Sequence, residues 1–173
     1  MALAILLISV FAANNLFNGA LSQFGVIPRS FSHWYHILLA PFIHEDLYHL
    51  TNNLIGLMIF SSISLLRPIS LFLKSSLFII VISGMLMWLF ARDGVHIGAS
   101  GWIFGLWSFA IILGWFDRRI MNLSLSCVVL FLYGSMIFGV FPIDSKVSFE
   151  AHLFGALSGG LFAFIYARFM QRS

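Results

Sequence analysis

The sequence predicts an all-α membrane protein, a polytopic bundle of six transmembrane helices in one domain over residues 1–173. Hydrophobic residues make up 61% of the 173 residues and charged residues only 9%, whereas a soluble domain carries about 25% charged residues. The mean hydropathy is +1.01, and the apolar runs approach the roughly 20 residues that a spanning helix needs. A chain of this length forms one compact bundle rather than several domains.

Six apolar runs are predicted to form the helices, and a long aromatic-rich connection separates the first two. The runs cover residues 2–17, about 46–66, about 71–90, 100–116, about 121–141 and about 150–170. No basic residue precedes the first run, so we expect no cleaved signal peptide. Aromatic side chains favour the membrane–water interface, and connections of this length are often functional. We therefore expect residues 18–45 to lie partly in the interface and to contain short helical pieces.

The basic residues predict the orientation of the bundle, because six spans place both termini on one side. The lysines and arginines on that side are Arg67, Lys74, Arg118, Arg119, Arg168 and Arg172, against Arg29, Arg92 and Lys146 on the other. By the positive-inside rule both termini face the cytoplasm, and the fourth run begins at the outer side. The net charge of +3 is small and fits membrane orientation rather than nucleic-acid binding.

A serine stands among small residues where the fourth run begins, in the order Gly98, Ala99, Ser100, Gly101. A helix start offers unpaired backbone N–H groups and the positive end of the helix dipole. A serine in this position either caps the helix, which is its commoner role, or acts as a nucleophile beside an oxyanion site.

Polar residues in two other runs favour the nucleophile, since polar groups inside a bilayer are costly. His49 and Asn53 are four residues apart and share one helix face, whereas His44 points elsewhere if the helix extends back to it. His152 opens the sixth run. With the predicted topology, Ser100, His49 and His152 lie at one depth near the outer surface, as nucleophilic catalysis requires.

Each of these residues also has a purely structural interpretation. Intramembrane His and Asn side chains commonly bond neighbouring helices, and the glycine pairs commonly pack them. The two GxxxG pairs are Gly101/Gly105 and Gly155/Gly159. The acidic residues expected on a solvated rim are Glu45, Asp46, Asp93, Asp144 and Glu150, and the histidines assigned to loops without a role are His33, His36 and His96.

Together the motifs resemble those of the rhomboid family of intramembrane serine proteases. The family's Gly-x-Ser-Gly motif stands at residues 98–101, and its second-span pattern His-x4-His-x3-Asn stands as His44, His49 and Asn53. Its last-span pattern stands as His152, Gly155 and Gly159. The three motifs occur in order on the predicted second, fourth and sixth spans, and the resemblance covers the chain from about Tyr35 onward.

The resemblance implies a Ser–His dyad without a third acid, in which Ser100 attacks a peptide carbonyl and His152 acts as base and then acid. His49, Asn53 and the Ser100 amide would form the oxyanion hole. The residues in supporting positions would be Gly98, Gly101, Phe104, Gly155, Gly159 and His44. Substrates would be transmembrane segments of other membrane proteins in the bilayer, with no cofactor and no metal. We expect the protein in a prokaryotic inner membrane.

The chain departs from the family pattern at two places. Tyr35 and His36 stand where the loop often carries Trp-Arg, and Phe104 stands where a Tyr is frequent. Phe104 keeps the ring that can pack against His152.

Three other functions are alternatives. A catalytically inactive relative could bind or escort membrane proteins. His44, Glu45 and His49 resemble a zinc-protease motif, but the spacing is one residue too long for one helix face. A transporter or proton relay would favour acidic residues at mid-membrane, and the acidic residues here cluster at the ends of the runs.

Overall fold

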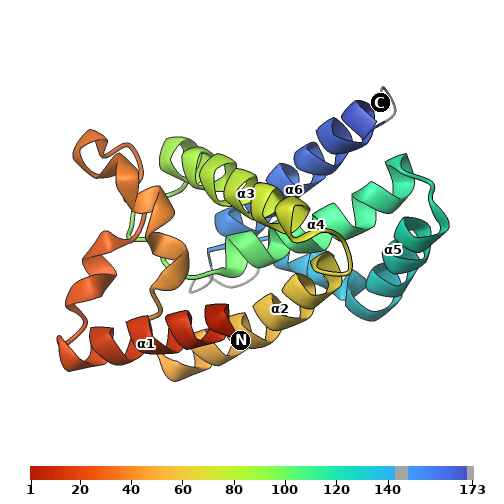
Figure 1. The fold of residues 1–173 in the computed structure, drawn as a ribbon. Coiled ribbons are helices and arrows are strands. Elements are labelled where there is room, and N and C mark those ends of the chain that lie inside the picture. The colour runs from red at the N-terminus through yellow and green to blue at the C-terminus, as the bar shows by residue number, and fades with distance from the viewer. Residues whose placement is uncertain (143–147, 171–173) are drawn as a thin grey trace.

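The computed structural model describes residues 1–142 and 148–170. Within these residues the chain is a bundle of α-helices joined in part by short 3₁₀ helices (Figure 1). The α-helices are α1 (Ala2–Leu16), α2 (Leu47–Ser64), α3 (Ile69–Phe90), α4 (Ser100–Phe116), α5 (Ile120–Tyr133) and α6 (Phe149–Met170). The 3₁₀ helices are η1 (Ala20–Phe24), η2 (Phe31–Leu38), η3 (Ala40–Phe42) and η4 (Gly134–Val140). The six predicted helices are therefore present.

The predicted fifth helix is α-helical over only part of its length. Tyr133 departs from helical geometry, with φ −128° and ψ 14°, and the chain continues as η4. Two glycines, Gly134 and Gly139, fall in this segment, and glycine is a poor α-helix former. The prediction of one continuous helix over 121–141 is corrected accordingly.

Three helices are long and apolar enough to cross a membrane among the residues described: α3, α5 together with η4, and α6. α1 and α4 are apolar but shorter. The 17 residues of α4 extend about 26 Å, which is less than the roughly 30 Å of a hydrocarbon core. The apolar helices indicate an integral membrane protein, and the count of six spans stays a prediction.

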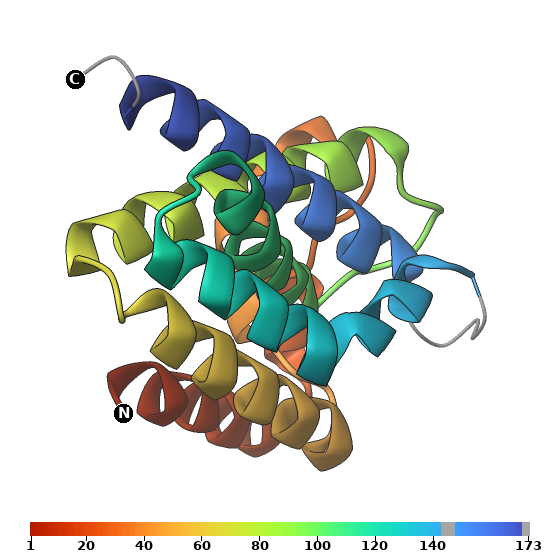
Figure 2. The same cartoon turned by 90° about the vertical axis from the view of Figure 1, so that its right-hand side faces the viewer.

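The short helix α4 lies in the middle of the bundle, where α2, α3, α5 and α6 pack around it (Figure 1, Figure 2). Every residue from Gly101 to Ala110 is buried, and Leu106, Phe109 and Leu113 are fully buried. Protein rather than lipid therefore surrounds most of α4. Because the apolar side chains of α4 face other helices, the length of α4 need not match the thickness of the bilayer.

The helices α4 and α6 pack through facing glycines. A Cβ added to Gly155 would overlap the carbonyl oxygen of Gly101 and lie 2.8 Å from its carbonyl carbon. A Cβ on Gly159 would overlap the Gly105 carbonyl in the same way. Small residues let helix backbones approach closely in a membrane, where no hydrophobic drive exists between helices. The prediction that the two GxxxG pairs join these helices is confirmed.

The connection between α1 and α2 lies against α3 and the segment that precedes α4. Val26 and His96 pair as an antiparallel bridge, with N···O distances of 2.8 and 2.9 Å. The indole N–H of Trp88 donates to the Ser30 carbonyl at 3.0 Å. The expected short helical pieces are η1, η2 and η3, and the exposed aromatic side chains of η2 are Phe31, Trp34 and Tyr35.

Two polar residues of the predicted loops and rim make specific hydrogen bonds, the buried His36 and the exposed Asp46. His36 is 2% exposed, and its Nδ1–H donates to the Gly25 carbonyl at 2.9 Å, which fixes the fold of the connection. Asp46 caps α2 by accepting the His49 N–H at 2.7 Å. The rim residue Asp144 and the basic residues Lys146 and Arg172 lie outside the described residues.

We predict that Gly155→Leu lowers the free energy of unfolding, because the new side chain must displace the backbone of α4. Overpacking of this kind costs about 1–3 kcal/mol. The measurement is reversible unfolding of the purified protein in detergent micelles.

Gly160→Ala is the matched control on the same helix. Its Cβ would lie 2.7 Å from Ile112 Cδ1, the end of a flexible side chain that can move aside, so the loss should be smaller than for Gly155→Leu. Wild-type stability in Gly155→Leu would contradict the packing of α4 on α6 through this face.

Candidate active site

Ser100 is the first residue of α4 and does not cap it. The N-cap is Ala99, whose carbonyl accepts the Ile103 N–H at 3.0 Å, and no side chain caps this helix. Gly98 has a φ of +107°, a conformation that favours glycine, and its N–H donates to the Ala40 carbonyl at 2.9 Å. The capping interpretation of Ser100 is therefore wrong. The half-buried hydroxyl stands at the positive end of α4.

Two polar side chains of α2 reach the turn that precedes Ser100. A Cβ added to Gly98 would lie 2.6 Å from His49 Cε1 and 3.1 Å from Asn53 Nδ2. His49 and Asn53 therefore both contact the backbone two residues before Ser100, as the shared helix face predicted. Any side chain at position 98 would push His49 and Asn53 away. Position 98 therefore requires glycine for packing as well as for its positive φ.

His44, which precedes α2, is hydrogen-bonded to Asn53 of α2. It is 0% exposed, and Asn53 Nδ2 donates to His44 Nε2 at 3.0 Å. Burial, with the neighbouring His49 as a smaller cause, lowers the pKa of His44 to about 4. The ring is therefore neutral at pH 7, so Nε2 is free to accept. Asn14 of α1 donates to the His44 carbonyl at 3.3 Å, which ties α1 to the site.

The positions of His44 and His49 concern the alternative of a zinc site at His44, Glu45 and His49. His44 lies in the segment before α2 rather than on its face, and its Nε2 is occupied by Asn53. In the described part of the chain, no group of three or more His, Cys, Asp or Glu side chains is placed to hold a metal ion.

His152, in the first turn of α6, is held on two sides. Its Nδ1–H donates to the Gly139 carbonyl in η4 at 2.9 Å. The Phe104 ring, one turn after Ser100, stacks on the imidazole with centroids 4.0 Å apart and planes 6° from parallel. The prediction that Phe104 packs on His152 is confirmed. Gly139 had no assigned part in the sequence-based prediction.

The helices that carry Ser100 and His152 meet beside these two residues. A Cβ on Gly101 would lie 3.1 Å from the Ala151 carbonyl oxygen. The neighbours of Ser100 and His152 are thus in contact, although no hydrogen bond joins Ser100 Oγ to His152 among the described residues. Catalytic hydrogen bonds are often long without substrate and tighten in the complex.

A polar network joins the start of α6 to the loop before α4. Glu150 is 6% exposed and pairs with Arg92 Nε at 3.3 Å, so its placement on a solvated rim is wrong. His96 Nε2–H donates to the Arg92 carbonyl at 2.9 Å, and a 3.0 Å bond joins its Nδ1 to Ser148 Oγ. Composition indicates a polar rim but not which residues pair, which is why the sequence missed this network.

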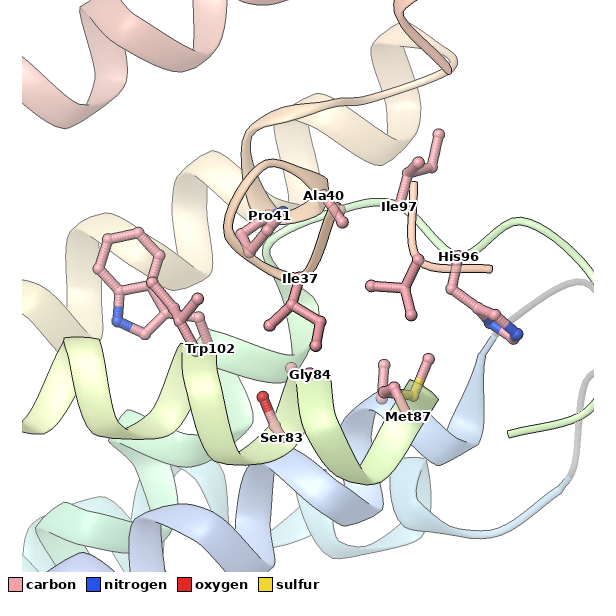
Figure 3. Close-up of a pocket in the computed structure, with 14 residues that line it drawn as sticks. Ile37, Ala40, Pro41, Ser83, Gly84, Met87, His96, Ile97 and Trp102 are labelled. Carbon is pink, nitrogen blue, oxygen red and sulfur yellow. The ribbon is translucent and has the colours of Figure 1, made fainter. Parts of the chain in front are cut away.

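A cavity of about 40 Å³ borders the turn before α4, and Gly98 and Gly101 contribute to its lining (Figure 3). Its walls come from the α1–α2 connection, α3, the turn and the starts of α4 and α6, and include Ile37, Gly84, Trp102 and Ala151. They are mostly apolar. The volume has room for at least one water molecule.

Comparison with known proteins identifies the family. A family model described as Rhomboid domain matches residues 31–169. An uncharacterized protein of Mycobacterium tuberculosis is 31% identical over 150 residues, covering 82% of this chain and 62% of that protein. An uncharacterized protein of Mycobacterium leprae is 34% identical over 138 residues, covering 75% and 55%.

A plant protein matches over a similar length. Rhomboid-like protein 11, chloroplastic, of Arabidopsis thaliana is 30% identical over 161 residues, covering 84% of this chain and 57% of that protein. The chain thus spans between 55% and 62% of the length of these relatives. By the family match over most of its length, the chain belongs to the rhomboid family.

Proposed function

We propose that the protein is an intramembrane serine endopeptidase in which Ser100 is the nucleophile and His152 the general base and acid. The observation that carries the proposal is the stack of His152 on Phe104, one helical turn from Ser100. The hydroxyl at position 100 is not used to cap α4, so it is available to react. The imidazole donates from Nδ1 to a carbonyl, which leaves Nε2 as the basic nitrogen.

The reaction proceeds in two stages. Ser100 Oγ attacks the carbonyl carbon of the scissile peptide while His152 Nε2 takes its proton, and a tetrahedral oxyanion forms. Collapse of this species breaks the C–N bond, and His152 gives the proton to the leaving amine. Water then attacks the acyl-enzyme, with His152 again taking and returning a proton, and releases the second product.

The oxyanion is stabilised by His49, Asn53 and the backbone N–H of Ser100. The side chains of His49 and Asn53 lie against Gly98, close to the start of α4. The first backbone N–H groups of an α-helix have no partner within the helix. His44 holds the Asn53 amide in a fixed orientation. Donors fixed in advance stabilise developing charge without a cost of reorganisation during the reaction.

The substrates are transmembrane segments of other membrane proteins, and the site opens at the outer side of a prokaryotic inner membrane. Family membership and the apolar helices support a membrane setting for the site. Bacterial relatives support the prokaryotic assignment. The distribution of basic residues supports cytoplasmic termini.

The dyad predicts that Ser100→Ala and His152→Ala each abolish cleavage of a model transmembrane substrate in detergent or proteoliposomes. Members of one catalytic unit are not additive, so the double variant should be no worse than either single variant. Ser62→Ala, at an exposed position of α2, is the control that removes a hydroxyl elsewhere. If the wild type cleaves no such substrate, the inactive binding or escort function takes its place. Full activity in Ser100→Ala would remove Ser100 as the nucleophile.

The oxyanion site predicts that His49→Ala or Asn53→Ala lowers kcat by about 10²–10³-fold with little change in KM, since each removes one donor. The matched control is Asn52→Ala, the exposed neighbour on α2, which should keep wild-type kinetics. A change confined to KM would show that the residue contacts the ground-state substrate instead.

The orientation predicts that a reporter active only in the cytoplasm works when it is fused behind the C-terminus. The same reporter inserted near Lys146 should be inactive. The reverse pattern would place Ser100 and His152 at the cytoplasmic face.

A further inference from the structure

We propose that Gly139, in η4, is a positioning residue for His152. Its carbonyl fixes the tautomer of the imidazole, and its lack of a side chain allows His152 to stack on Phe104. This inference rests on the proposed role of His152 as the base and adds a third partner to the dyad.

The tautomer follows from the hydrogen bond between His152 and Gly139. A neutral imidazole carries one N–H, and a carbonyl oxygen can only accept. The 2.9 Å contact from Nδ1 to the Gly139 oxygen therefore places the hydrogen on Nδ1 and leaves the lone pair on Nε2. In Ser-His-Asp enzymes a carboxylate does this, and loss of the correct tautomer there costs about 10⁴-fold in kcat. In this protein the backbone carbonyl of Gly139 takes the role that the carboxylate has in those enzymes.

The carbonyl is available because of where η4 ends. A 3₁₀ helix bonds residues three apart, so its last carbonyls have no partner within the helix. Gly139 is the penultimate residue of η4, which ends at Val140. The change from α5 to η4 after Tyr133 thus presents a free acceptor to the first turn of α6.

Packing, rather than backbone conformation, requires glycine at position 139. Its φ is not in the left-handed region, which among the glycines holds only Gly19, Gly94 and Gly98. A Cβ would lie 2.7 Å from Phe104 Cζ and 3.3 Å from His152 Nδ1. Phe104 is 8% exposed and packs edge-on against Trp107, so its ring has little room to move. A side chain at 139 therefore pushes on both rings of the stack.

Gly139→Ala should lower kcat by about 10- to 100-fold and leave KM within about twofold, because a displacement of 1 Å can cost about 10²-fold in rate. Gly134→Ala is the matched control in the same 3₁₀ helix, since the atom nearest to its Cβ is Leu130 Cδ2 at 3.9 Å. This control should keep wild-type kinetics.

The second readout is the ¹⁵N NMR spectrum of the His152 ring in detergent, at a pH where the ring is neutral. The wild type and Gly134→Ala should show a protonated Nδ1 and a bare Nε2, and Gly139→Ala a mixture of tautomers. A wild-type ring protonated at Nε2 would overturn the inference, and so would wild-type kcat in Gly139→Ala. The wild-type spectrum decides the point even if Gly139→Ala does not fold.

The experiments distinguish a failure of the protease function from a failure of the positioning role of Gly139. A wild type that cleaves no substrate contradicts the protease function, whereas its ring spectrum still shows whether Gly139 holds His152. A wild type that cleaves substrate with the hydrogen on Nε2 leaves the protease function standing and removes Gly139 as the positioning residue.

Discussion

The close approach of α4 and α6 is the constraint on which the rest of the site depends. Gly155 and Gly159 lie directly against the carbonyls of Gly101 and Gly105, so the two backbones are in contact. Side-chain packing would hold helices 8–10 Å apart. Because Ser100 and His152 stand at the starts of these two helices, the glycine contact sets the separation between them. The stack of Phe104 on His152 and the contact of Gly101 with Ala151 follow from it.

Some of the buried polar groups around this contact bond one another. Burying an unpaired polar group in a membrane protein costs several kcal/mol. His44, Asn53 and Asn14 form one chain of hydrogen bonds that joins α1 and α2 beside the turn of Ser100. Arg92 and Glu150 form an ion pair at the other side of the site. The first set of bonds ties α1 to α2, and the ion pair ties the start of α6 to the segment before α4.

Much of this arrangement could be predicted from the sequence, because helical periodicity and residue size determine which residues share a helix face and how closely two helices can pack. The shared face of His49 and Asn53 and the glycine faces of α4 and α6 follow from spacing alone. The partner of His152 could not be predicted, since a backbone carbonyl has no side-chain signal and the break after Tyr133 decides where it points. The burial of Glu150 was missed because its partner Arg92 is distant in sequence.

The central claim is that α4 and α6 bring a reactive serine beside its base, and covalent labelling of Ser100 tests it most directly. A fluorophosphonate forms a bond from the serine oxygen to phosphorus and expels fluoride only when the hydroxyl is activated by a base. Peptide mass spectrometry should find the adduct on Ser100 in the wild type and in Ser62→Ala, and should not find it in His152→Ala. An unlabelled Ser100 in the wild type, or equal labelling in His152→Ala, would contradict the account.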